Sequence, residues 1–133
     1  MELAFIFLLL SLSSKTFVGA ADPVLDTSGH QLRTDADYYV LPILRGQGGG
    51  LTLGSDNGSC PLDVVQAPEE VSRGLPLRFT PARGGATVLS GADHNVVFSA
   101  ASVCVQSTVW RVGQRSGSGE RVVTTGGAAG NPG

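Results

Sequence analysis

The stretch from Leu75 to Ser99, LPLRFTPARGGATVLSGADHNVVFS, decides the class of fold. Three short runs rich in Val, Leu, Thr and Phe are separated here by segments that carry Gly and Pro. Runs of about 4 to 8 residues bounded by such turn residues are typical of β-strands. The stretch therefore predicts strands at 75–80, 86–89 and 94–99.

The same alternation extends over most of the chain. Gly accounts for 19 of the 133 residues, which favours a fold with many turns. No helical period is sustained, and the best candidate, APEEVSRGL at 67–75, contains Gly74 and allows at most one helical turn. Many short strands predict an all-β barrel or sandwich. The further expected strands are 38–44, 51–54, 61–66, 102–113 and 120–125.

The first 21 residues are predicted to be a secretory signal peptide. The apolar run from Leu3 to Leu12 is too short to span a bilayer comfortably, and small residues follow from Val18 to Ala20. We expect cleavage near Ala20 or Ala21. This leaves residues 22–133 as one soluble domain without membrane contact, which is secreted to the extracellular space or sent to the vacuole.

Charge and motifs exclude several classes of function. A formal net charge of −2 and a pI near 5.5 argue against nucleic acid as a partner, because no basic patch is available to neutralise phosphates. Neither SGHQ around His30 nor ADHN around His94 has the context of a nucleophile elbow or a metal site. We interpret both histidines as surface turn residues, and Glu69 and Glu70 as a solvated turn. We expect no enzymatic activity, no metal and no cofactor.

The two cysteines, Cys60 and Cys104, predict one disulfide bond in an oxidising compartment. Closing a loop of this length would stabilise the fold by about 4 kcal/mol on the chain-entropy model. Two distant cysteines and two isolated histidines do not have the spacing of metal ligands. Asn57-Gly58-Ser59 is an acceptor sequence for N-linked glycosylation, and Asn-Gly is equally a common β-turn pair, so both interpretations stay open.

Several motifs, in the right order, resemble the plant Kunitz-type (soybean trypsin inhibitor) family. The first is DPVLDTSGHQLRTDADYYVLP, with its apolar pair and Asp, its Gly-bearing turn and its Tyr-Tyr strand. CPLDVVQ is similar to the family's segment after its first cysteine. The last two motifs resemble the miraculin-like branch in particular. The four motifs occupy residues 22–42, 60–66, 103–113 and 123–133.

The resemblance implies a β-trefoil, which is a six-stranded barrel capped by three hairpins. It also implies that the pair Cys60–Cys104 corresponds to the family's first disulfide. Members of the family normally continue for several dozen residues beyond GNPG, whereas this sequence stops at Gly133. We therefore expect a trefoil that lacks roughly its last third, as a fragment of a longer product rather than the product of a truncated gene.

The resemblance also places a reactive loop around Arg83, which follows Cys60 by 23 residues. Arg83 would be the P1 residue, held between Pro81 and Ala82 on one side and Gly84 on the other. A P1 arginine would reach the aspartate at the base of a trypsin-like pocket. Two glycines after Arg83 raise the freedom of the loop. A gapless comparison from the following strand would instead put Gly84 at P1.

Two further positions bear on how such a loop would work. In strong inhibitors an Asn from the N-terminal segment often braces the loop from inside, and the equivalent position here is Thr34, whose side chain is shorter. The alternative interpretation of Arg83 is an ordinary exposed loop charge. Trp110 and the pair Tyr38 and Tyr39 could stack on sugars, but Trp110 is better explained as a strand residue packed into the core.

The function implied by the resemblance is inhibition of serine endopeptidases of the trypsin type, in plant defence or in the control of stored protein. Inhibition would be substrate-like and reversible, by a monomer without a cofactor. The alternative is a non-inhibitory storage or defence protein of the miraculin-like kind, or an inhibitor of another class of protease.

Overall fold

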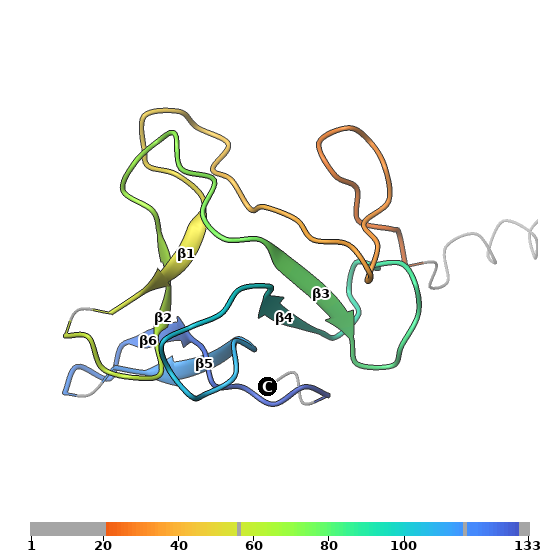
Figure 1. The fold of residues 1–133 in the computed structure, drawn as a ribbon. Coiled ribbons are helices and arrows are strands. Elements are labelled where there is room, and N and C mark those ends of the chain that lie inside the picture. The colour runs from red at the N-terminus through yellow and green to blue at the C-terminus, as the bar shows by residue number, and fades with distance from the viewer. Residues whose placement is uncertain (1–20, 56, 116, 131–133) are drawn as a thin grey trace, which may run out of the picture.

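The computed structural model describes residues 21–55, 57–115 and 117–130 (Figure 1). The predicted signal peptide lies almost wholly outside these residues. The described residues form strands and turns without a helix, so the all-β prediction is confirmed. Accordingly, the described part of the chain contains no helix that is long and apolar enough to cross a membrane.

Six strands form two antiparallel sheets. The first sheet has four strands in the order β1-β2-β6-β5, and the second is the hairpin of β3 and β4. An isolated bridge between Val97 and Val109, and a hydrogen bond of 2.8 Å from the Trp110 amide to the Val96 carbonyl, join the hairpin to the segment that leads into β5. The strands are β1 (Leu51–Gly54), β2 (Asp63–Gln66), β3 (Leu77–Pro81), β4 (His94–Phe98), β5 (Arg111–Gln114) and β6 (Arg121–Thr124).

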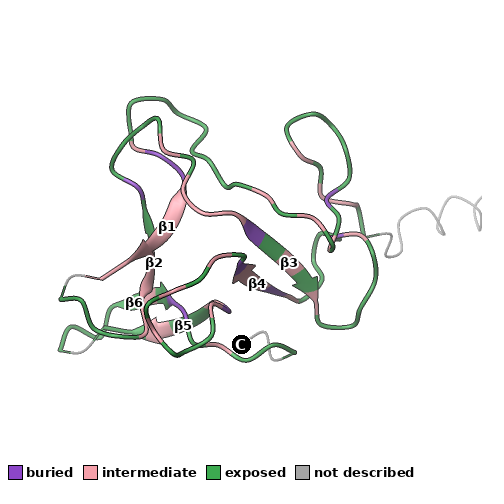
Figure 2. Ribbon diagram, in the orientation of Figure 1, coloured by how far each residue is buried: buried purple, intermediate pink, exposed green. Residues whose placement is uncertain are grey.

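The best-buried part of the described structure is the open end of the β3–β4 hairpin, opposite its connecting loop. Leu77 and Phe98 face each other in the register and are 0% and 1% exposed (Figure 2). Burial of side chains of this size contributes about 1.5 to 3 kcal/mol each. Trp110, the residue before β5, packs against Phe98 with the rings tilted by 57° and their centroids 5.2 Å apart. Its predicted packing is confirmed, although it is half-buried and lies outside the strand. Tyr38 adds to this corner by exchanging two backbone hydrogen bonds of 2.8 Å with Leu77.

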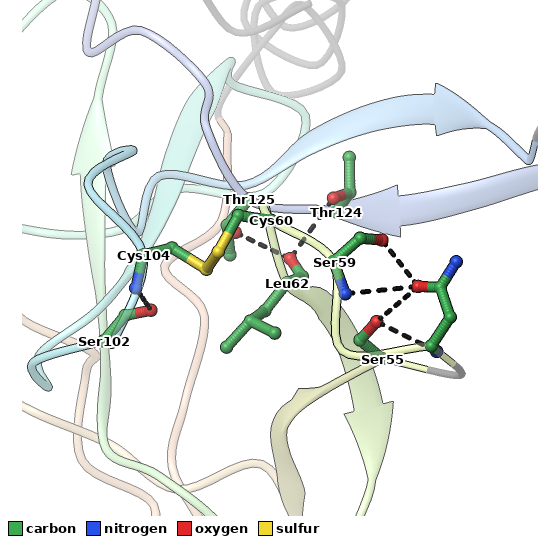
Figure 3. The surroundings of a disulfide bond; sticks show 9 residues. Ser55, Ser59, Cys60, Leu62, Ser102, Cys104, Thr124 and Thr125 are labelled. Atoms are coloured by element: carbon green, nitrogen blue, oxygen red, sulfur yellow. Dashed lines mark hydrogen bonds between the residues drawn. A yellow bond between two sulfur atoms is a disulfide. The ribbon is translucent and has the colours of Figure 1, made fainter.

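The predicted disulfide between Cys60 and Cys104 is formed, with the two Cα atoms 5.7 Å apart (Figure 3). It connects the segment before β2 to the loop that precedes β5. Beside it, the hydroxyls of Thr124 and Thr125 both donate to the Leu62 carbonyl, at 3.2 and 2.6 Å. The disulfide thus ties the start of β2 to the loop before β5, and the two hydrogen bonds tie it to the end of β6.

Three expected strands do not form as predicted. Residues 38–44 and 86–89 make only isolated bridges, and 102–110 is an irregular loop with a single bridge at Val109. In that loop Val103 and Val105 are more than 90% exposed, so an extended backbone would gain no burial of these side chains. A run of β-branched residues favours a strand only where neighbours pair with it and cover one face. The predicted turn at 67–75 is confirmed, with Ser72 donating to the Glu69 carbonyl.

Candidate functional site

The loop between β3 and β4 carries Arg83 and is held firmly at its base. Pro81, the last residue of β3, lies opposite His94, the first residue of β4. The Ala82 amide then donates to the Asp93 carbonyl at 3.0 Å, one step beyond the strand pair. In Figure 1 this loop lies beside the N-terminal segment, away from the four-stranded sheet. The two ends of the loop 82–93 are therefore held together by the strands.

Arg83 itself lies in a tight, exposed turn. The Gly84 amide donates to the Pro81 carbonyl at 3.3 Å, and this bond closes a turn that has Ala82 and Arg83 at its centre. Gly84 has φ of 74° and Gly85 has φ of 114°, which are values that residues with a Cβ rarely adopt. Nothing lies within 4 Å of where a Cβ on either glycine would be, so conformation rather than space requires glycine here.

The N-terminal segment braces this loop from the inside through Thr34. Its hydroxyl donates to the Gly85 carbonyl at 2.9 Å, and its amide donates to the Ala86 carbonyl at 3.0 Å. The bridge between Arg33 and Thr87 continues the same pairing. A residue 51 positions away in the sequence thus satisfies a carbonyl two residues after Arg83. Threonine is long enough to make this contact.

Two acidic residues hold residues 33–38, called the bracing segment from here on, in place. Asp37 accepts from the hydroxyl of Ser99, the residue after β4, at 2.8 Å and from Arg78 of β3, which ties the segment to both sides of the hairpin. The Ser99 hydrogen bond, followed by Arg78, lowers the pKa of Asp37 below its ordinary value. Asp35 makes a two-bond pair with Arg33 at 3.0 and 3.1 Å, and this hydrogen bonding lowers the pKa of Asp35.

An open cavity of about 390 Å³ lies beside the Arg83 turn. Pro81, Arg83 and Thr87 line it together with His94. The Nδ1 of His94 is 2.8 Å from the Ala92 carbonyl, while its Nε2 is buried without a hydrogen-bond partner in the described structure. The interpretation of His94 as a surface turn residue is therefore wrong, because it begins β4 and its ring is partly buried. His30 is exposed after a turn, as predicted.

The other predicted site residues lie apart from this loop. Asn57 is in the turn between β1 and β2, close in sequence to Cys60, and this turn lies far from the loop between β3 and β4 (Figure 1). Its glycosylation stays a prediction. Glu69 and Glu70 are in an exposed turn, as predicted. Within the described ranges no three His, Cys, Asp or Glu side chains gather as metal ligands would.

No sequence signal pointed to the contacts of Asp37, because its partners are 41 and 62 residues away. Nor did any signal point to the Tyr38 hydroxyl, which accepts from the Arg33 amide at 2.8 Å because the chain turns between these two nearby residues. Both residues fall inside the N-terminal motif, where their role in holding the bracing segment could not be read from residue type.

Comparisons with known proteins agree with this geometry. A family profile described as trypsin and protease inhibitor, the Kunitz legume family, matches residues 24–133. The α-amylase/subtilisin inhibitor of Oryza sativa subsp. japonica is 45% identical over 126 residues, which cover 90% of this chain and 63% of that protein. Miraculin of Synsepalum dulcificum is 42% identical over 147 residues, covering 100% of this chain and 67% of the relative.

A solved structure shows the same fold. The rice bifunctional α-amylase/subtilisin inhibitor has a TM-score of 0.71 and 43% sequence identity, over 82% of this chain and 67% of that one. The chain thus spans about two thirds of the length of these relatives. By this match and by the all-β architecture, the chain belongs to the Kunitz legume family of trypsin and protease inhibitors, and its fold is the Kunitz-type β-trefoil.

Proposed function

We propose that the protein inhibits a serine endopeptidase through the loop from Pro81 to Gly85, with Arg83 as the P1 residue. The observation that carries the proposal is the bond from the Thr34 hydroxyl to the Gly85 carbonyl, because it supports the loop immediately after the candidate P1 position. A loop that is already ordered loses little conformational entropy on binding, and a smaller entropy loss gives a higher affinity. The exposed guanidinium of Arg83 then supplies the charge that a trypsin-like pocket recognises.

Binding requires one local change in the loop. A protease holds the residues around the scissile bond as an extended strand, whereas Arg83 rests in a turn. Opening the turn breaks the bond between Gly84 and Pro81, and a net loss of this kind amounts to about 0.5–1.5 kcal/mol. Pro81 keeps its φ fixed throughout, and the pairing of Ala82 with Asp93 stays in place below it. The change is confined to the tip.

A second candidate is inhibition of a subtilisin-type serine endopeptidase without a requirement for Arg83. It is favoured by the rice relative, which is named as an inhibitor of α-amylase and subtilisin and is 45% identical to this chain. The two glycines after Arg83 would let the loop take either register, with Arg83 or Gly84 facing the protease.

For both candidates we place the protein in the secretory pathway, in the extracellular space or the vacuole, and we expect it to act as a monomer without a cofactor. The disulfide between Cys60 and Cys104 supports an oxidising compartment. A role in plant defence or in the control of stored protein follows from a secreted inhibitor.

The test is a titration of trypsin and of subtilisin with the disulfide-bonded full chain. We expect wild type to inhibit trypsin, and Arg83→Ala to weaken inhibition by about 100-fold or more, as loss of a central binding residue does. Arg45→Ala is the matched control, because Arg45 is also exposed on a loop but lines a different cavity, together with Glu70 and Val71. Subtilisin inhibition that Arg83→Ala leaves unchanged would favour the second candidate. Failure of the folded wild type to inhibit either protease overturns both.

A further inference from the structure

Asn57 lies in a turn whose geometry is suited to chemistry on its own side chain. Within the described part of the chain, three donors converge on its Oδ1 (Figure 3). The Ser59 hydroxyl donates at 2.6 Å, the Ser59 amide at 3.2 Å and the Ser55 hydroxyl at 3.2 Å. They leave the Nδ2 of Asn57 without a hydrogen-bond partner among the described residues. The carboxamide carbon is therefore polarised, while its amino group is directed away from these contacts.

The residue that follows Asn57 supplies a nucleophile. Gly58 has φ of 70°, and nothing lies within 4 Å of where its Cβ would be. Its backbone N–H has no acceptor in the described structure. A glycine in this position leaves its amide nitrogen free of a neighbouring side chain, so the nitrogen can approach the carboxamide carbon of Asn57.

We propose that Asn57 is a site of spontaneous covalent modification, by deamidation through a cyclic imide with Gly58. Base removes the Gly58 amide proton, and the nitrogen attacks Cγ of Asn57 to form a C–N bond and a tetrahedral oxyanion on Oδ1. Collapse of this species expels Nδ2, which takes a proton from water and leaves as ammonia. Water then opens the five-membered imide at either carbonyl and yields aspartate or isoaspartate. The net reaction consumes one water and releases one ammonia.

The three donors to Oδ1 should make Asn57 react faster than an exposed Asn-Gly pair without such contacts. Negative charge develops on Oδ1 as the nitrogen of Gly58 attacks, and donors already aimed at that atom stabilise the charge without reorganising. The Ser59 hydroxyl, at 2.6 Å, is the shortest of the three and should contribute most. Ser59 would therefore be a positioning residue for the reaction at Asn57.

The chain contains its own controls. Asn95 is 3% exposed, precedes Val96, and has its Oδ1 occupied by the Gly130 amide at 2.7 Å. Asn131 precedes Pro132, which has no backbone N–H with which to form the imide. Of the three asparagines in the sequence, only Asn57 combines exposure with a following glycine.

The modification has two consequences. Aspartate at position 57 cannot accept an N-linked glycan, so deamidation and the predicted glycosylation compete for the same nitrogen. The new carboxylate also makes the net charge one unit more negative than −2. It would line an open groove of about 440 Å³ that Arg111 and Arg115 also line.

The test uses the full disulfide-bonded chain produced in bacteria, which add no N-linked glycan, and held in mildly alkaline buffer. Peptide mass spectrometry follows the gain of one mass unit and the appearance of isoaspartate at each asparagine. We expect modification at Asn57 and not at Asn95 or Asn131, and a faster rate in the folded chain than in the reduced, denatured chain. A slower rate at Asn57 in the folded chain overturns the proposal.

Ser59 variants test the part played by the donors. Ser59→Ala should slow the reaction in the folded chain by about tenfold, because it removes the shortest hydrogen bond to Oδ1. Ser59→Thr keeps the hydroxyl and should react at the wild-type rate. In the denatured chain all three proteins should react alike. If Ser59→Ala reacts faster than wild type when folded, the hydrogen bonds restrain the side chain instead of activating it, and the proposal fails.

Discussion

Two loops at opposite ends of the molecule are held by different means. The loop around Asn57 and Cys60 is anchored by a covalent bond to Cys104. The loop around Arg83 is anchored by backbone pairing at its base, by backbone pairing of its second half with the N-terminal segment, and by the hydroxyl of Thr34 near its tip. A covalent anchor protects the fold as a whole, because it restricts the unfolded chain. The hydrogen bond from the Thr34 hydroxyl acts on the local conformation of the second loop, so it can be removed without loss of the fold.

Removing the disulfide should have the largest effect on stability. The double variant Cys60→Ser and Cys104→Ser should lower the free energy of unfolding by about 4 kcal/mol, as expected for a loop closed across this separation. Equilibrium denaturation in urea measures the change. At temperatures where the variant is still folded, the Arg83 loop should keep its conformation. A variant as stable as wild type would show that the unfolded chain is restricted by other means.

Gly84→Ala should weaken the turn at the tip of the other loop. Its φ of 74° is unfavourable for a residue with a Cβ by about 1–2 kcal/mol, although no atom lies near enough to clash. We expect faster proteolytic cleavage within residues 82–86 and a small drop in melting temperature. Ala82→Ser, in the same turn but at a negative φ, is the control and should change neither.

Thr34→Val should reduce the order of the Arg83 loop while leaving the stability of the fold almost unchanged. The substitution keeps the shape of the side chain but leaves the Gly85 carbonyl without its hydroxyl partner. We expect stability to change by less than about 1 kcal/mol, since water can replace a half-exposed bond. Under the proposed function, inhibition should weaken by about fivefold to tenfold. Amide hydrogen exchange at 83–86 provides a readout independent of any protease, and Thr34→Ser should match wild type in both measurements.

The smallest effect should be a dependence of stability on acidic pH. The pKa of Asp37 is lowered in the folded state by Ser99 and Arg78, so its contribution is complete above its unfolded pKa near 3.8 and is lost as the pH falls through the lowered value. Asp37→Asn should make the melting temperature less dependent on pH below about 4. Glu69→Gln, in an exposed turn, is the control. If the melting temperature of Asp37→Asn depends on pH as that of wild type does, the ionised Asp37 carboxylate does not contribute to stability.

Sequence reasoning succeeded where the signal is local. The run LTLG predicted β1 with its observed bounds, and the two cysteines left one possible pair. It failed at 102–110, where valines stay exposed in a loop because no strand lies alongside most of it. It also could not show that Thr34 reaches Gly85, because that contact depends on a β-bridge between segments 51 residues apart.

The turn at Arg83 bears on how fast a protease could be captured. Under the proposed function, the bond from the Gly84 amide to the Pro81 carbonyl must open before a protease can hold the loop as an extended strand, so only the population with an open turn is competent to bind. The apparent dissociation constant then rises by the inverse of that population. The association rate should also fall below that of a loop already extended, while dissociation is unaffected. Variants that disfavour the turn without disturbing Thr34 would therefore bind sooner, and would do so without any new contact.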